Sequence, residues 1–201
     1  MTGLARPKLA AWLAVVSATV AVSLSVPPLR SVIEQSMAWH MVFQMPLLVL
    51  SGWLATRALA PADSVRRWGN FNQFGLTGLL ASQVIMAYWM LPLAIDRAVV
   101  LPAADALKLL TLFVAGGLLA DAFRRAPPVV QLFFMGYWVP MMAWLGMYLA
   151  TTDLRLCNAY SLDSQVRTGW GLFVLGAAVG VAWVVSVLAS KTEMKKPAAQ
   201  N

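Results

Sequence analysis

The sequence is poor in charge. Charged residues make up only 11% of its 201 positions, whereas hydrophobic residues make up 60%. A soluble domain carries about 25% charged residues, because its surface has to face water. The scarcity of charge therefore excludes a soluble globular domain, a disordered chain and a coiled coil. It indicates a protein whose surface faces lipid.

Cysteine and histidine are nearly absent: Cys157 and His40 are the only ones. One cysteine excludes an intrachain disulfide and any zinc site built from several cysteines. One histidine excludes a three-histidine metal cage. The chain also lacks a phosphate-binding glycine loop, an HExxH motif, a GxSxG motif and a CxxC pair. We therefore expect that the protein is not an enzyme.

Long apolar runs are what the sequence has in their place. A transmembrane helix needs about 20 mostly apolar residues. Six segments meet this requirement, separated by prolines and by charged residues, and they predict an all-α, polytopic membrane protein with about six transmembrane helices. The segments are 9–26, 39–59, 74–95, 104–123, 129–150 and 169–189.

The charges predict how these spans are oriented. Ten of the fifteen basic residues, but only three of the eight acidic ones, fall on one side of the predicted spans. The other side carries five of each, so the net charge of +7 belongs to one face. Cytoplasmic loops are rich in Lys and Arg, so both termini are expected in the cytoplasm. The basic excess is thus a topology signal, and we expect no nucleic-acid partner.

The predicted domain organisation is simple. Residues 1–190 form the six-helix transmembrane domain, and residues 191–201 form a polar cytoplasmic tail. The first segment, with Arg6 and Lys8 before its apolar run, also resembles a signal peptide, and cleavage there stays an alternative.

Small residues at Gly116-Gly117 and at Gly176 and Gly180 predict close helix packing. Charges inside a membrane often mark ion or proton paths, but Asp105 and Lys108 are expected near a span end, which argues against a pump.

The start of the second segment carries the most suggestive side chains. Met37, His40, Met41, Gln44 and Met45 fall on one stripe at helical spacing. Thioether and imidazole groups together suit Cu(I), so one interpretation is a copper site near the outer membrane surface. The alternative is ordinary packing, because Met is an adaptable filler and a single His at an interface is commonly an anchor.

Two further residues are candidates on the same face. The thiol of Cys157, in the connection between the last two segments, would be a soft ligand that completes a His/Met/Cys set. Its alternative is an inert packed thiol. Asp96, at the end of the third segment, would hold the ring N–H of a ligating His40. Otherwise Asp96 is simply solvated.

Three stretches together resemble the CtaG-type (caa-oxidase) cytochrome oxidase assembly proteins. They are His40-Met41-x-x-Gln44-Met45-Pro46-Leu47-Leu48, Leu91-Pro92-x-x-x-Asp96-x-Ala98, and Asp163-x-Gln165-x-x-x-Gly169. The resemblance implies a multi-pass inner-membrane protein linked to copper supply. Gln44 stands where that family often has a second histidine, and Leu107-Lys108 lies where a Glu-His pair is common. Only His40 and Asp96 therefore match the family's functional positions.

The leading hypothesis is a bacterial inner-membrane accessory or assembly protein for a copper- or haem-containing respiratory complex. It would bind Cu(I) on the periplasmic side through His40, Met37, Met41 and Cys157, with Asp96 behind them. Its partners would be the lipid bilayer and the respiratory complex. One alternative is a structural subunit of a larger membrane complex that binds no metal. A second is a small b-type cytochrome with His40 and a Met as axial haem ligands.

Overall fold

The described part of the chain is entirely helical. The computed structural model describes residues 5–23, 26, 29, 36–59, 72–156 and 160–195. Its elements are α1 (Ala5–Ser23), the π-helix η1 (Trp39–Gln44), α3 (Met45–Leu59), α4 (Leu76–Trp89), α5 (Pro92–Val100), α6 (Pro102–Arg125), α7 (Pro128–Thr151) and α8 (Leu162–Lys195).

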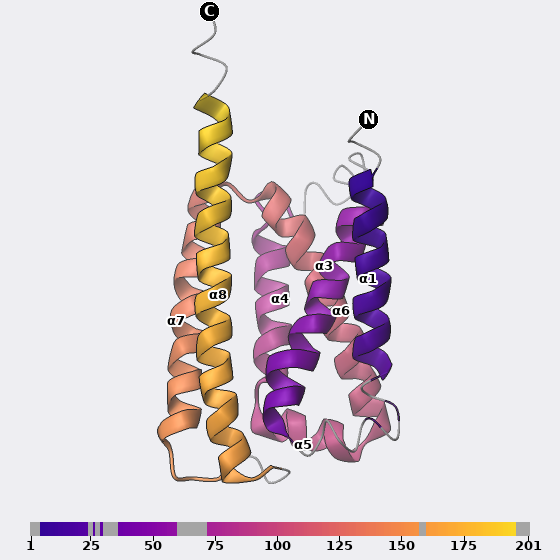
Figure 1. Cartoon of the computed structure of the whole chain (residues 1–201), viewed down its shortest axis with the longest axis vertical. Helices are drawn as coiled ribbons and strands as arrows, with labels where there is room; N and C mark the ends of the chain where they lie inside the picture. The colour runs from indigo at the N-terminus through magenta and orange to yellow at the C-terminus, as the bar shows by residue number, and fades with distance from the viewer. Residues whose placement is uncertain are drawn as a thin grey trace, which may run out of the picture.

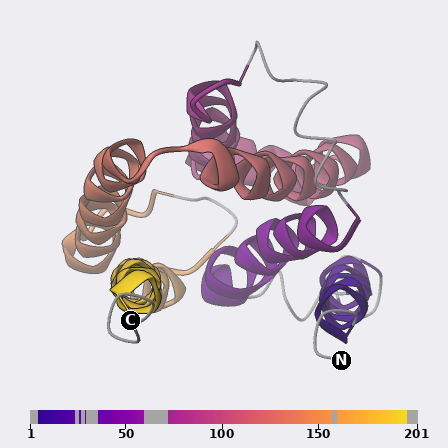
Figure 2. The same ribbon diagram turned by 90° about the horizontal axis from the view of Figure 1, so that it is seen from above.

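The helices form two groups that stand side by side. In the first, α3 packs against both α1 and α6, and α6 packs in turn against α4. In the second, α7 and α8 form an antiparallel pair (Figures 1 and 2). The short helix α5 runs across one end of the molecule, called the α5 end below. The start of α1 and the end of α8 both lie at the opposite end (Figure 1).

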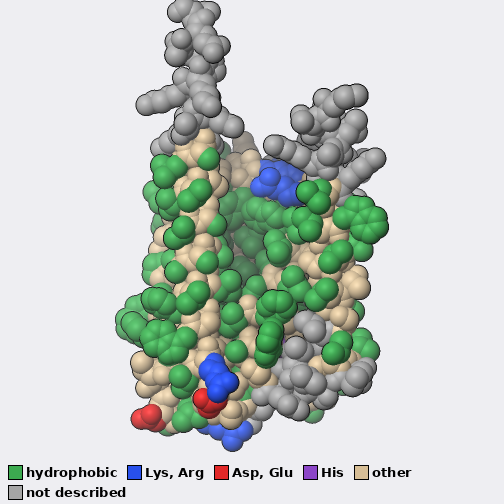
Figure 3. Space-filling model, viewed as in Figure 1, with side chains coloured by type: hydrophobic (Ala, Val, Ile, Leu, Met, Phe, Trp, Pro, Cys, Tyr) green, Lys and Arg blue, Asp and Glu red, His purple; other side chains and the backbone are tan. Residues whose placement is uncertain are grey.

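Three helices are long and apolar enough to cross a membrane, within the part of the chain that the structure describes. They are Pro102–Arg125, Pro128–Thr151 and Leu162–Ala189, and the bent pair α4 and α5 makes a fourth if it counts as one span. Their outward side chains are large and apolar, including Phe133 at 80% and Trp144 at 77% exposure. Such helices suggest a membrane protein, because this much apolar surface is costly in water. Figure 3 shows apolar side chains along the length of the helices, with the visible charged side chains near the two ends.

The first two predicted spans fall short of that length as single α-helices. The apolar part of α1 covers Ala11–Val20, and α3 has 15 residues. However, η1 leads directly into α3 and adds six residues to it. The prediction of six spans therefore remains a prediction.

The third predicted span differs from the structure at its outer end. The segment was expected to be helical through residue 95, but α4 ends at Trp89 and the chain turns by 71° into α5. Pro92 takes the first position of α5. Proline suits this position because its missing N–H has no helical partner there, whereas within a helix it would disrupt the hydrogen bonding. An apolar run that is continuous in sequence thus becomes two helices.

Glycines allow the closest helix contact in the bundle, between α3 and α6. A Cβ atom on Gly52 would collide with the backbone carbonyl of Phe113, and one on Gly116 would collide with that of Val49. The expected role of Gly116 in packing is therefore confirmed. At the α7–α8 contact, Gly146 and Gly169 bring the two backbones together, because a Cβ atom on either would collide with the carbonyl of the other. Gly176 and Gly180, which the sequence singled out, face the side chains of the same helix pair, at Met142 and Val139.

We predict that Gly52→Ala and Gly116→Ala each lower the free energy of unfolding by about 1–3 kcal/mol, because the new methyl group forces α3 and α6 apart. Far-UV circular dichroism during denaturation in mixed micelles measures this change. Gly136→Ala in α7 is the matched control, since nothing lies within 4 Å of its Cβ position. A Gly116→Ala protein as stable as the wild type would show that the contact is not tight.

Candidate functional site

The methionine and histidine stripe is buried in the bundle. Met37, His40, Met41, Gln44 and Met45 are each at most 5% exposed. Their neighbours Trp39 and Phe43 are 54% and 48% exposed and point outward. One face of this segment is therefore turned into the protein, at the α5 end of the bundle.

The segment is a π-helix because of the proline that follows it. Pro46 has no backbone N–H, and its ring would press on the carbonyl of Val42 in a regular α-helix. The Met45 N–H instead donates to the carbonyl of His40, five residues back. π-turns within helices occur frequently at functional sites.

A lysine and an aspartate from α6 meet His40 inside the bundle. Lys108 Nζ lies 3.3 Å from His40 Nε2 and 2.6 Å from Asp105 Oδ1. The side chain of Lys108 is 1% exposed and that of Asp105 is 9% exposed. Since an ammonium group can only donate, His40 Nε2 is the acceptor, and a neutral ring then carries its proton on Nδ1.

This buried pair differs from the expectation that the sequence raised. Asp105 and Lys108, three residues apart on α6, form an ion pair. They were expected at a span end, where such a pair contributes only a few tenths of a kcal/mol. Both are instead removed from solvent, where an ion pair is stable only with good geometry and further hydrogen bonds. Ionisable residues buried in a helical membrane bundle are usual markers of a functional site.

The connection between α7 and α8 closes the α5 end of the bundle. Tyr160 is 2% exposed, and its ring lies 6.5 Å from the ring of His40. Arg155 Nε donates a 2.7 Å hydrogen bond to the carbonyl of Tyr160. Gln165 accepts from the N–H of Leu156 at 2.9 Å and donates to the carbonyl of Leu154 at 3.1 Å. The first turns of α8 thus hold the connection that covers His40.

The three stretches that carry the family resemblance come together here. The N–H of Met37 donates to Ser164 Oγ at 2.7 Å, which ties the start of the stripe to α8. On α5, Ala94, Ile95 and Ala98 are buried in the same apolar core as Met37 and Met41. Segments about 50 to 130 residues apart in sequence therefore form one structural unit around His40 and Lys108.

The predicted metal ligands remain a prediction, and the structure places only some of them. Met37 and Met41 flank His40 and are buried with it. Asp96 lies half-buried on α5. Cys157 lies outside the described residues. Over the described ranges, no group of three or more His, Cys, Asp or Glu side chains is arranged to hold a metal ion.

The donor set does not fit Cu(I) at His40 Nε2 as the side chains lie. The Lys108 ammonium occupies the lone pair of this nitrogen, and its positive charge would oppose a cation there. Copper at Nε2 would require Lys108 to move away. Copper binding therefore remains a prediction, and it requires that Lys108 leaves His40 Nε2.

Lys108 and Asp105 were missed as site residues, although the sequence held a signal. Lys108 is the fifth residue of the predicted span 104–123, inside the apolar run. The bundle packs around it, and its four-carbon stem does not carry the ammonium out to the interface.

Comparisons with protein-family models, with curated proteins and with solved structures give no match to this chain. The resemblance to the CtaG-type proteins rests on the three quoted stretches alone.

We predict that Asp105→Asn destabilises the protein by about 3–5 kcal/mol, because it leaves the buried Lys108 charge without its carboxylate. Adding Lys108→Met to this variant should restore most of the loss, since the cation is then gone as well. Unfolding in mixed micelles reports both values. Asp163→Asn is the control, because Asp163 and Arg167 form an ion pair that is 73% exposed on each side. An Asp105→Asn protein no less stable than this control would show that the Asp105 carboxylate does not stabilise a buried Lys108 charge.

Proposed function

We propose that the protein is an accessory or assembly protein of a copper- or haem-containing respiratory complex in the inner membrane of a bacterium, with no catalytic reaction of its own. The observation that carries this proposal is the meeting of the three resembling stretches around His40 at the α5 end. Residues that match one family in order along the chain have a stronger claim when they also share one place in the fold. The lipid bilayer and the respiratory complex are the partners in this proposal.

The proposed topology has six spans with both termini in the cytoplasm and the α5 end in the periplasm. Two observations support it. Among the described side chains, basic residues outnumber acidic ones at the end opposite to α5, where Arg57, Arg124 and Arg125 lie with Asp121, whereas the α5 end has equal numbers of each. The start of α1 and the end of α8 lie at the same end of the bundle, as an even number of crossings requires (Figure 1).

In this role the buried cluster of His40, Lys108 and Asp105 holds in place the elements that form the periplasmic surface. It joins η1 to α6, and the hydrogen bonds of Gln165 and Arg155 hold the α7–α8 connection over it. A partner that docks at this end would meet an ordered surface, so less conformational entropy is lost on binding.

A subunit that binds no metal is the second candidate function. The contact of Lys108 with His40 Nε2 favours it, because that nitrogen already has a partner. The same contact bears on the b-type cytochrome, since an axial haem bond at Nε2 would need Lys108 to be displaced.

We predict that alkaline phosphatase fused after Thr151, at the end of α7, is active in bacterial cells. The same enzyme fused after Asn201 should be inactive, whereas green fluorescent protein at that position should be fluorescent. These results follow from a periplasmic α7–α8 connection and a cytoplasmic C-terminus. An active phosphatase at Asn201 would invert or refute the topology.

We predict that deleting the gene lowers the amount of assembled respiratory oxidase, measured from the haem difference spectrum and copper content of the membranes. Wild-type protein should restore the complex. Lys108→Met combined with Asp105→Asn should restore it less well at equal protein level. Oxidase at the normal level in the deletion strain would refute the proposed function.

Composition of the purified material separates the two candidates. An assembly protein is absent from the finished complex, whereas a structural subunit stays in it at a fixed ratio after mild detergent extraction. The visible spectrum and copper content of the purified chain complete this test. Copper that is retained, and lost in His40→Ala, would support the copper interpretation, whereas a colourless, metal-free chain would favour the structural subunit.

A further inference from the structure

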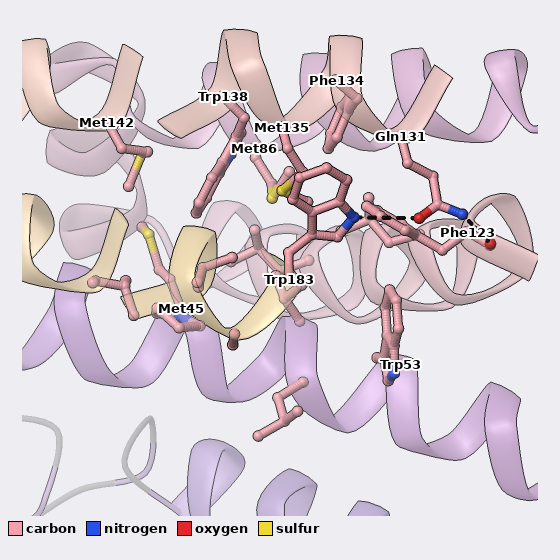
Figure 4. A pocket seen from close by; sticks show the side chains of 18 of the residues that line it. Met45, Trp53, Met86, Phe123, Gln131, Phe134, Met135, Trp138, Met142 and Trp183 are labelled. Carbon is pink, nitrogen blue, oxygen red and sulfur yellow. Dashed lines mark hydrogen bonds between the residues drawn. The ribbon is translucent and has the colours of Figure 1, made fainter. Parts of the chain in front are cut away.

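A long apolar cavity lies between the two groups of helices. Its volume is about 640 Å³, within the range of ordinary ligand pockets. Six of the chain's eleven methionines line it: Met41, Met45, Met86, Met90, Met135 and Met142. Trp53, Trp138 and Trp183 line it too, and Figure 4 shows these three rings among the side chains that surround the cavity. Figure 3 shows the corresponding hollow between the helix groups.

The cavity is shaped for a hydrocarbon chain. It extends along α3 from Met41, next to His40, to Arg57 near the opposite end. At 1.5 Å per residue, the sixteen steps from Met41 to Arg57 make a path of about 24 Å. Protein interiors are normally close-packed, and methionine is the side chain that adapts best to a flexible apolar occupant.

The interior polar group of the cavity is already satisfied by the protein. Gln131 Nε2 donates to the carbonyls of Ala126 and Phe123 at 2.9 and 3.1 Å. Gln131 Oε1 accepts a 3.3 Å hydrogen bond from Trp183 Nε1 (Figure 4). The middle of the cavity therefore offers an occupant apolar contact and little hydrogen bonding.

The charged side chain that lines the cavity is Arg57, at one end of it. Its guanidinium lies 5.2 Å from the centre of the Trp53 ring. Within the described ranges no carboxylate pairs with Arg57, whereas Arg125 on α6 is bound to Asp121 at 2.8 Å. Arg124 lies alongside, donating to the carbonyl of Thr56 at 3.1 Å. A cation in the lining of an apolar channel, with a second cation close to it, complements an amphipathic anion.

We infer that this cavity binds one anionic glycerophospholipid, with its phosphate on Arg57 and one acyl chain along the methionines. Basic pockets between transmembrane helices on the cytoplasmic side are suited to anionic headgroups. This site is separate from the proposed role in respiratory assembly. It depends only on the proposed orientation, which puts Arg57 at the anionic cytoplasmic leaflet.

Native mass spectrometry of the full chain tests the inference. The protein is reconstituted with equimolar phosphatidylglycerol and phosphatidylcholine of identical chains, extracted in mild detergent, and the retained lipid is counted. We expect one phosphatidylglycerol per chain, preferred over phosphatidylcholine by about fivefold, the contribution of one basic residue near a membrane surface. Arg57→Gln should remove this preference. Arg167→Gln is the matched control, because it removes one positive charge at the α5 end.

A second pair of variants tests the acyl-chain part of the cavity without changing charge. Val179→Phe narrows the cavity, since Val179 lines it, and should lower the retention of both lipids. Val174→Phe is the same substitution on the same helix at an outward position that is 63% exposed, and should behave as the wild type. Equal retention of the two lipids by the wild type, or an unchanged preference in Arg57→Gln, would overturn the inference. A normal oxidase level in the deletion strain would leave it standing.

Discussion

The ammonium group of Lys108 is the charge around which the α5 end of the bundle is organised. It lies between the imidazole of His40 and the carboxylate of Asp105, and it is almost completely removed from solvent. A buried cation is tolerated only with such partners close by, so the positions of η1 and α6 are fixed relative to each other. The α7–α8 connection is then hydrogen-bonded over this pair. The polar groups of this end thus hold one another in place within an apolar bundle.

The two halves of the bundle are packed to different degrees. Between α3 and α6, glycines bring the backbones into direct contact, and between α7 and α8 another glycine pair does the same. Between these two units lies the methionine-lined cavity, which no close backbone contact bridges in the described residues. The α7–α8 pair is joined to the rest at both ends. At the α5 end the contacts are made by Ser164 and the connection before α8. At the opposite end the short link from α6 to α7 and the hydrogen bonds of Gln131 to Phe123 and Ala126 hold the two units together. The middle, between these two points, has room for a ligand.

The sequence predicts those features that depend on local pattern. The helices α6 and α7 begin and end within two residues of the predicted spans 104–123 and 129–150, because charged residues and prolines bound the apolar runs. The burial of the Met37 to Met45 stripe follows from helical spacing. The turn between α4 and α5 was missed, since the apolar run continues through Pro92. The contact of Lys108 with His40 joins residues 68 apart, and no spacing rule predicts it. Composition also gives no sign that methionines from four helical segments gather around one cavity.

The π-helix at Trp39–Gln44 has a consequence for comparing this chain with others. A π-turn holds about one residue more than the α-helical turn it replaces, so it behaves structurally as an insertion of one residue. One residue corresponds to a rotation of about 100° around the helix axis. The stretch from His40 to Leu48 runs through this insertion. In a homologue with a regular α-helix here, the histidine that occupies the same place in space would stand one position closer in sequence to the proline. An ungapped alignment would then match His40 to the wrong face of that helix.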